Sequence, residues 1–226
     1  MKTLADEPGT LTAPSKALQL ICRGVARFPL TPSFRHYNLS ISREKKIIWF
    51  RVAKAGSRTL FHELRENGVK LDAEHAMSVY YAPRLYRDYF KFAFVRNPWD
   101  RLVSCWNNKV LDENYFQFSE PVREKMRVFE NFVAYVASLD VERCDQHLRL
   151  QCRLIDLNHI DFLGRLESFG TDLHALFELL QLDVTGSAVR NASRNRKPYR
   201  QYYSDELAET VGRLYRRDVQ VFRYDF

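Results

Sequence analysis

One short stretch of the chain contains residue types that bind phosphate: a lysine, a glycine and two residues with hydroxyl groups. It consists of Ala53, Lys54, Ala55, Gly56, Ser57, Arg58 and Thr59. Lys54 supplies a mobile positive charge, and Gly56 lets the backbone approach a ligand closely. A helix beginning here would add its free backbone N–H groups and the positive end of its dipole. The stretch therefore predicts an anion site, although an ordinary strand-to-helix loop with Ser57 as the helix N-cap would need no ligand.

The residues around this stretch predict a strand before it and a helix after it. Residues 47–50 and 52 form an apolar run rich in β-branched and aromatic side chains, which is typical of a buried strand. Apolar residues then recur at helical spacing, namely at Leu60, Phe61 and Leu64. The stretch differs from the Walker loop of nucleoside-triphosphate enzymes, because Lys54 precedes Gly56 instead of following a second glycine.

A second stretch offers an arginine and a hydroxyl that together suit a phosphate monoester. Residues 91–95 predict another buried strand, Arg96 follows it directly, and Pro98 favours the start of a helix. Ser104 follows eight residues after Arg96, near the second turn of that helix. An arginine fork and a hydroxyl at the end of a strand can bind the oxygens of one phosphate. A salt bridge from Arg96 to Asp100, with Ser104 as an ordinary helix hydroxyl, is an equally good interpretation.

The order of the predicted elements indicates an α/β fold with a central parallel sheet flanked by helices. Ligands of such sheets bind at the C-terminal ends of the strands, where both stretches lie. Further elements are expected at residues 128–139 (helix), 159–164 (strand), 172–182 (helix) and 204–217 (helix, followed by an aromatic tail). We expect residues 31–42 and 69–87 to be irregular, and residues 112–127 to show little periodic structure.

Composition places the chain among globular proteins that bind an anionic ligand. With 226 residues, 46% of them hydrophobic, it can form one domain with a substantial core. The formal net charge of +7 fits a nucleotide, an acidic glycan or a nucleic acid. The cysteines lack the spacing of a zinc site, and we expect Cys144 and Cys152 to be free thiols. No apolar run reaches about 18 residues, so no membrane span is predicted.

Together, the two stretches resemble the nucleotide-binding segments of sulfotransferases. They read FRVAKAGSRTL at residues 50–60 and FAFVRNPWDRLVSCW at residues 92–106. The likeness is to the branch of carbohydrate (Golgi-type) sulfotransferases and their bacterial relatives. It continues at residues 146–149, 160–167 and 202–224. The resemblance implies a P-loop-NTPase-like sulfotransferase fold for a sulfotransferase domain at residues 43–226. The small, polar residues at the start of the chain predict a partly disordered N-terminal segment at residues 1–42.

The resemblance also implies a donor, 3′-phosphoadenosine 5′-phosphosulfate (PAPS), a product, 3′-phosphoadenosine 5′-phosphate (PAP), and no metal. In the family the first stretch binds the 5′-phosphosulfate. The matching positions are Lys54, Ala55, Gly56, Ser57, Arg58 and Thr59. Arg96 and Ser104 match the pair that binds the 3′-phosphate. Ala53 stands where the family usually has proline, and Arg58 where serine or threonine is common. Neither change removes a backbone donor, so we expect donor binding to be kept.

Three further groups of residues are assigned around these stretches. Related glycan sulfotransferases carry a catalytic histidine between the two segments. His75 is therefore predicted as the general base and Glu74 as the second candidate, although a surface histidine in a polar loop would look the same. His147 matches a family position near the acceptor, and we assign it to substrate binding together with Arg101. A basic loop at residues 190–200 is either a lid over the nucleotide or a solvated loop. Its candidate nucleotide-binding residues are Arg196, Lys197 and Tyr199.

Two other functions remain compatible with the sequence. A P-loop-type nucleotide kinase would share the strand-loop-helix arrangement, but the chain lacks a Walker loop and an evident acidic pair for Mg²⁺. A noncatalytic binder of anionic glycan would use the same positive charge, whereas the basic and aromatic pattern of an RNA-binding module is absent. A saccharide hydroxyl is the favoured acceptor. The sequence does not indicate an oligomeric state. Without a recognisable targeting segment, we expect a cytoplasmic enzyme of bacterial type, or else a luminal domain lacking its membrane anchor.

Overall fold

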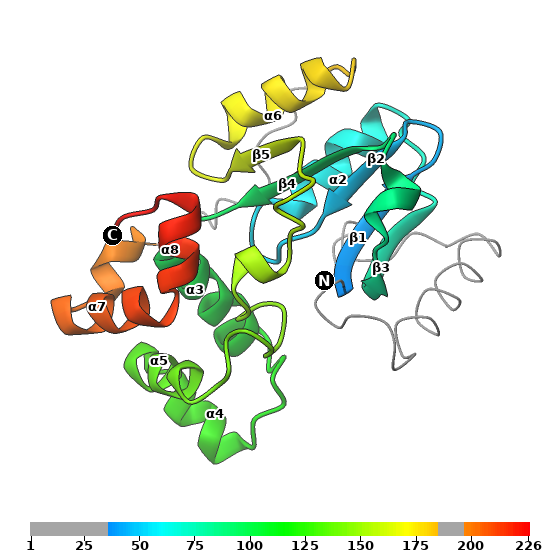
Figure 1. Cartoon of the computed structure of the whole chain (residues 1–226). Coiled ribbons are helices and arrows are strands. Elements are labelled where there is room, and N and C mark those ends of the chain that lie inside the picture. Colours follow the sequence, from blue (N-terminus) through cyan, green and yellow to red (C-terminus); the bar gives the residue numbers. More distant parts are fainter. Residues whose placement is uncertain (1–35, 185–196) are drawn as a thin grey trace. The chain divides into compact units, whose positions relative to one another are not determined.

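The computed structural model describes residues 36–184 and 197–226 of the chain (Figure 1). These residues form two compact units, which we describe separately. The sheet unit comprises the described residues of Met1–Val52, Gly56–Val95 and Leu154–Ala192, and the helical unit comprises those of Ala53–Ala55, Arg96–Arg153 and Ser193–Phe226. The first predicted phosphate-binding stretch is thus divided, with Lys54 in the helical unit and Gly56 in the sheet unit.

A five-stranded sheet forms the centre of the sheet unit in the described part of the chain (Figure 1). The strand order is β3 (Ala73–Tyr80), β1 (His36–Ser42), β2 (Ile47–Phe50), β4 (Phe90–Val95) and β5 (Phe162–Arg165). Strands β2, β4 and β5 run parallel, whereas β1 pairs antiparallel with both β2 and β3. The predicted α/β class is confirmed. The sheet is mixed, because β1 and β3 add an antiparallel edge to the three parallel strands.

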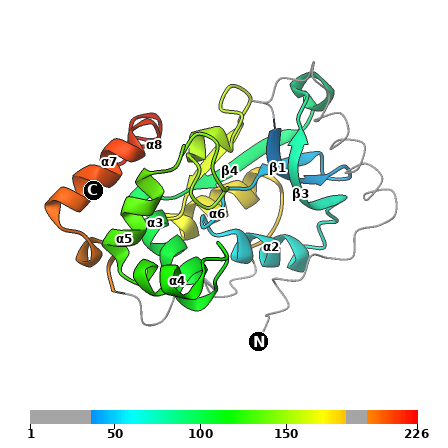
Figure 2. The ribbon, with the colours of Figure 1, turned by 90° about the horizontal axis from the view of Figure 1, so that it is seen from below.

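Two helices cover one face of this sheet, and both are labelled in Figure 2. Their bounds are Ser57–Glu66 for α2 and Phe169–Leu179 for α6. Trp49 of β2 packs against Phe61 of α2 with ring centroids 4.7 Å apart, and Phe94 of β4 packs against Phe169 of α6 at 5.1 Å. Trp49 also stacks on Phe92, two residues before Phe94. Because side chains two apart in a strand share a face, α2 and α6 lie on the same side of the sheet.

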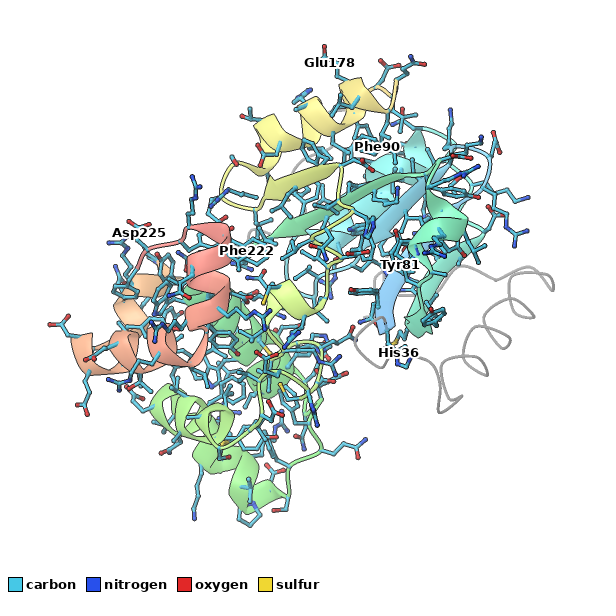
Figure 3. The ribbon with its side chains drawn as sticks, viewed as in Figure 1. His36, Tyr81, Phe90, Glu178, Phe222 and Asp225 are labelled. Atoms are coloured by element: carbon cyan, nitrogen blue, oxygen red, sulfur yellow. The ribbon has the colours of Figure 1, made fainter. Side chains whose placement is uncertain are left out.

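The opposite face of the sheet is filled by an aromatic cluster. The ring of Phe50 lies 5.1 Å from that of Tyr37 and 5.2 Å from that of Tyr81. Tyr81, labelled in Figure 3, is fully buried and stacks on Tyr86 of the 3₁₀ helix η2 (Pro83–Tyr86). Both faces of β2 are therefore buried, as its continuous apolar run predicted.

Strand β1 lies where the sequence predicted irregular chain, so that prediction is wrong. Its apolar residues alternate with polar ones, but Ser40 and Ser42 are buried as well. The hydroxyl of Ser40 donates a hydrogen bond to the backbone carbonyl of Glu74 on β3. These polar residues concealed a strand that is covered on both faces. The strand also precedes residue 43, where the sequence placed the start of the domain.

Strand β3 corrects the prediction of irregular chain at residues 69–87. It is the last strand of the described sheet and pairs with β1, with shifts in register on either side of Leu39. Bulged edge strands of this kind are defined by backbone pairing more than by an apolar face, so their residues need not alternate cleanly. The alanines, charged residues and histidine of β3 therefore gave no strand pattern.

In the helical unit, a helix begins two residues after Arg96. Its elements are α3 (Pro98–Trp106), the π-helix η3 (Asn107–Asp112), α4 (Glu120–Met126), α5 (Phe129–Ala137), η4 (Gln151–Arg153), η5 (Tyr199–Tyr202), α7 (Asp205–Leu214) and α8 (Arg216–Phe222). The side chain of Asn97 caps α3 by accepting hydrogen bonds from the backbone N–H groups of Trp99 and Asp100. Trp106 of α3 packs against Phe129 of α5 with ring centroids 5.2 Å apart.

The predicted helices are confirmed, with two additions. Helix α6 begins three residues before the predicted start at residue 172, and α4 forms where little structure was expected. Helix α8 replaces part of the predicted aromatic tail and ends at Phe222, which Figure 3 labels. Its buried Asp218 accepts backbone hydrogen bonds from Gln151 at 2.7 Å and Cys152 at 2.9 Å, a long-range contact that sequence periodicity does not reveal. None of the described helices is long and apolar enough to cross a membrane.

Candidate functional site

The predicted helix after the first stretch begins at a glycine and not at a serine cap. Gly56 is the N-cap of α2 and adopts a left-handed conformation with φ of 83°. Ser57 is the first helical residue, and its hydroxyl lies 3.5 Å from the carbonyl oxygen of Val52. No side chain caps this end of α2. The helix therefore begins without the competing acceptor that a serine cap would have provided, which suits the binding of an external anion.

Gly56 is also required by packing within the sheet unit. A Cβ atom at this position would lie 2.6 Å from Cε2 of Phe169 and 3.1 Å from Cδ1 of Leu166. The sequence predicted that this glycine serves close approach to a ligand. The structure shows in addition that it lets the start of α2 lie directly against the start of α6.

Thr59 supplies a buried hydroxyl in the first turn and a half of α2. The residue is 2% exposed, and its Oγ1 has no hydrogen-bond partner among the described residues. A buried hydroxyl without a partner loses the hydrogen bonds that it made with water in the unfolded chain. A ligand oxygen is one group that would restore them.

Lys54 links the first stretch to the second within the helical unit. Its backbone has a positive φ of 71°, and its carbonyl oxygen accepts a hydrogen bond from Nη1 of Arg96 at 3.1 Å. Its ammonium group donates to Oδ1 of Asn108 in the π-helix at 2.9 Å. The two sequence stretches, which are separated by more than 30 residues, therefore meet at Lys54 and Arg96.

Arg96 forms the salt bridge that the sequence left open. Its Nε and Nη2 atoms both lie 2.8 Å from Oδ2 of Asp100. Buried Gln151 fixes the backbone on the other side, because its amide accepts from the N–H of Arg96 at 3.0 Å and donates to its carbonyl at 2.8 Å. Ser104 is half-buried on α3, about two turns into the helix. The geometry thus holds Arg96 at a fixed position beside Lys54.

Arg101 has a structural position, which differs from the acceptor-binding role assigned from the sequence. The residue is 2% exposed, and its guanidinium donates to three backbone carbonyls. Those carbonyls belong to Ala53 at 3.0 Å, Gln146 at 2.8 Å and Arg149 at 2.8 Å. Arg101 therefore fastens the residue before Lys54 to the segment that carries His147, and its guanidinium faces the chain itself.

His147 lies in that segment beside two polar groups. Its Nδ1 is 2.7 Å from Oδ1 of Asp145, and its ring meets that of Tyr115 edge-on at a centroid distance of 4.6 Å. Burial lowers the pKa of His147 below its usual value, although Asp145 partly opposes this change. His147 is therefore neutral near pH 7.

His75 and Glu74 lie on strand β3 and not in the loop expected for them. Nη1 of Arg51 lies 3.2 Å from Nδ1 of His75, and the ring of Phe61 packs on the imidazole at 4.6 Å. Burial, followed by the positive charge of Arg51, lowers the pKa of His75 to about 4. Glu74 is buried and forms a hydrogen-bonded ion pair with Arg65.

The described residues include only part of the predicted lid at residues 190–200. Arg196 lies outside the described residues. Lys197 is exposed, and Tyr199 belongs to η5, where its hydroxyl lies 3.4 Å from Nδ2 of Asn97. Tyr199 is thus near the residue that follows Arg96 in the helical unit.

Three residues of the site were missed by the sequence predictions. Asp145 could have been found, because an aspartate two residues before His147 is a common turn signal. Asn108 and Gln151 gave no such signal, since their contacts depend on a π-helix and on a long-range backbone pairing. Among the described residues, no group of three or more His, Cys, Asp or Glu side chains could hold a metal ion.

Comparisons with known proteins agree with the two motifs. The profile of the sulfotransferase family matches residues 37–225. A stretch of 125 residues is 30% identical to carbohydrate sulfotransferase 12 of Xenopus laevis and covers 43% of this chain and 30% of that protein. The chain thus spans less than a third of the length of that curated relative. No solved structure matches the chain significantly. The resemblance read from residues 50–60 and 92–106 is confirmed: the chain belongs to the sulfotransferase family.

Proposed function

We propose that this protein transfers a sulfonate group from PAPS to a hydroxyl group of a carbohydrate. The main support is the contact between the two nucleotide-binding stretches, in which Arg96 donates a hydrogen bond to the carbonyl of Lys54. Family membership supports sulfonate transfer, and the family's usual donor supports PAPS.

The donor would be held by residues on both sides of Lys54. The start of α2 would bind the 5′-phosphosulfate through its backbone N–H groups, and the buried hydroxyl of Thr59 supports this assignment because it lacks another partner among the described residues. The residues of this group are Ala55, Gly56, Ser57, Arg58 and Thr59. Arg96 would bind the 3′-phosphate with Ser104, and Lys197 and Tyr199, with Arg196, would contact the rest of the nucleotide.

The reaction moves an SO₃ unit in line between two oxygen atoms. The acceptor oxygen forms a bond to sulfur, the bond from sulfur to the bridging oxygen of PAPS breaks, and its electron pair stays on the 5′-phosphate of PAP. Lys54 would stabilise the charge that develops on the bridging oxygen, which is the largest contribution that a protein makes to such transfers. A general base must accept the proton of the acceptor hydroxyl.

The carbohydrate acceptor rests on coarser support. The similar protein from Xenopus laevis is named a carbohydrate sulfotransferase, and this chain carries a formal net charge of +7. A positive protein would attract an acidic polysaccharide at long range, and this attraction would weaken as salt is added.

Calorimetric titration with PAP tests the donor site. We expect PAP to bind the wild-type protein, adenosine 5′-phosphosulfate without the 3′-phosphate to bind more weakly, and both Lys54→Ala and Arg96→Ala to bind PAP at least about 10-fold more weakly, as loss of one charged hydrogen-bonding group implies. Arg213→Ala is the matched control, because Arg213 is an exposed arginine of α7 that pairs with Glu209. Preference for Mg²⁺-ATP over PAP would instead favour a nucleotide kinase, and glycan binding without turnover would favour a noncatalytic binder.

A further inference from the structure

A buried aspartate in the first turn of α8 lacks the positively charged partner that such a residue usually has. Asp218 is fully buried, and no lysine, arginine or histidine of the described residues forms a salt bridge with it. Burial raises the pKa of Asp218, although backbone hydrogen bonds and the charge of Arg101 oppose this change. Because an unpaired buried carboxylate costs free energy, its presence has to be explained by the groups that it binds.

Asp218 binds the backbone of the short helix η4. Its Oδ2 accepts the N–H of Gln151 at 2.7 Å, and its Oδ1 accepts the N–H of Cys152 at 2.9 Å. Hydrogen bonds from backbone N–H groups to a carboxylate are stronger than those between neutral groups. Buried Tyr215, the N-cap residue of α8, adds a bond from its hydroxyl to the carbonyl of Leu148 at 2.8 Å. The start of α8 therefore fixes the backbone of Gln151.

Gln151 in turn fixes the backbone of Arg96 through its side-chain amide. Oε1 accepts the N–H of Arg96 at 3.0 Å, and Nε2 donates to the carbonyl of the same residue at 2.8 Å. Two residues of paired antiparallel strands exchange their backbone hydrogen bonds in the same way. Because the two bonds hold the peptide groups on both sides of the Cα atom, they set the direction in which the side chain of Arg96 leaves the backbone.

The direction of this side chain matters because little of it is accessible. The side chain of Arg96 is 11% exposed, and its guanidinium is held by Asp100 at 2.8 Å and by the carbonyl of Lys54 at 3.1 Å. An arginine binds phosphate oxygens through a planar fork, so its contribution depends on the orientation of that plane. A shift of the backbone of Arg96 would turn the accessible part of the guanidinium away from its ligand.

We propose that Gln151 and Asp218 are positioning residues that give the donor site its preference for a nucleotide with a 3′-phosphate; this inference rests on the proposed function. Asp218 holds the backbone of Gln151, and Gln151 holds the backbone of Arg96, whose guanidinium binds the 3′-phosphate. Both positioning residues are fully buried, so they act through Arg96 and not by contact with the nucleotide. Helix α8 thereby takes part in donor selection.

A purely structural role for these contacts predicts different results. In that case Asp218 would only attach α8 to η4, and its loss would lower stability and weaken the binding of every nucleotide alike. A positioning role affects only the 3′-phosphate, and it requires the guanidinium of Arg96. The backbone groups that Gln151 binds are present whichever side chain occupies position 96, so stability and positioning can be separated.

The binding of PAP and of adenosine 5′-monophosphate (AMP) tests the preference directly, because the two nucleotides differ only in the 3′-phosphate. In Gln151→Met, which keeps the size of the side chain and removes its amide, we expect PAP to bind about 10-fold more weakly and AMP to bind within about 2-fold of the wild-type affinity in calorimetric displacement. Asp218→Asn should show a smaller loss for PAP alone, because the amide nitrogen of asparagine cannot accept a backbone N–H.

Matched controls lie on the surface of the same unit. Gln220→Met on α8 and Asp205→Asn on α7 replace exposed residues of the same types, and both variants should bind PAP as the wild-type protein does. An equal loss of affinity for PAP and AMP in Gln151→Met would overturn the inference.

A double-mutant cycle with Arg96→Ala tests whether Gln151 acts through Arg96. In the Arg96→Ala background we expect Gln151→Met to change the Kd for PAP less than about 2-fold, because the side chain that it positions is absent. Urea denaturation should still show a loss of stability, because the backbone groups of residue 96 remain. Additive losses of PAP affinity would contradict the inference. If Gln151→Met does not fold, Asp218→Asn takes its place in the cycle.

Phosphorus NMR of bound PAP gives a further test that needs no acceptor. In Gln151→Met we expect the signal of the 3′-phosphate to move toward its position in free PAP, while the signal of the 5′-phosphate keeps its bound position. Equal changes in both signals would count against a role specific to the 3′-phosphate. The two proposals fail separately: wild-type protein that does not bind PAP would refute the proposed donor site, whereas an unchanged preference for PAP over AMP in Gln151→Met would refute only the positioning role.

Discussion

His75 and His147 show how the same side chain acquires opposite chemistry in two regions of one protein. Both are partly buried, and burial lowers the pKa of each. In the sheet unit the partner is Arg51, which only donates, and in the helical unit it is Asp145, which only accepts. The comparison teaches that the partner on one ring nitrogen, more than burial, determines what the other nitrogen can do.

The segment that carries His147 should depend most strongly on Arg101. We expect Arg101→Met to lower the free energy of unfolding by about 3 kcal/mol, because it leaves three partly buried backbone carbonyls without the donor that buried Arg101 supplies. Urea denaturation measures this loss. The nitrogen NMR signals of His147 should change while those of His75 persist, and an equal effect from the exposed variant Arg213→Met would contradict the assignment.

A substitution of Gly56 gives the corresponding test of stability in the sheet unit. We expect Gly56→Ala to cost about 2 kcal/mol, because alanine is strained at a φ of 83° and its Cβ would lie 2.6 Å from the ring of Phe169. Gly68→Ala is the control, since Gly68 has a φ of 64° but no atom within 4 Å of the added Cβ. The difference between the two melting temperatures isolates the contact with Phe169, and equal losses would show that only the backbone conformation matters.

Asp145→Asn should sharpen the comparison through pH. Asp145 raises the pKa of His147, so its neutral replacement lowers that pKa further. An NMR titration should therefore show the His147 imidazole losing its proton at a lower pH than in the wild-type protein. The groups that face His147 and stay in place are Tyr115, Lys109 and Lys54. An unchanged titration of His147 would contradict the effect assigned to Asp145.

Arg51→Met should give the smallest effect. The positive charge of Arg51 lowers the pKa of His75, so its removal raises that pKa above the present value of about 4. Burial is the larger cause and remains, so the pKa should stay below the usual 6.5. An NMR titration of His75 measures the change. The titration of His147 in the same sample should not move.

The parts of the fold that depend on local pattern could be predicted from the sequence. The apolar runs before Ala53 and before Arg96, the proline at the start of α3 and the acidic first turn of α7 each specify an element through nearby residues. Strand β1 could not be predicted in this way, because its buried Ser40 is satisfied by a strand that lies more than 30 residues away.

The site was predictable to a similar degree. The types of Lys54 and Arg96 indicated an anion site, and the structure brings the two residues into contact. The difference between His75 and His147 could not be predicted from the sequence, because it depends on which side chain faces Nδ1 of each ring. One of those partners is separated from its histidine by 24 residues.

The π-helix after α3 makes the contacts around it sensitive to the deletion of a single residue. In an α-helix each residue turns the direction of the next side chain by about 100°, and the π-helix accommodates a backbone bond from Glu113 to Asn108 that spans five residues. Removal of one of residues 110–112 would favour ordinary α-helical pairing and turn Glu113 and Tyr115 away from Lys109. A single-residue deletion, which a surface loop usually tolerates, should therefore break both of these contacts at once.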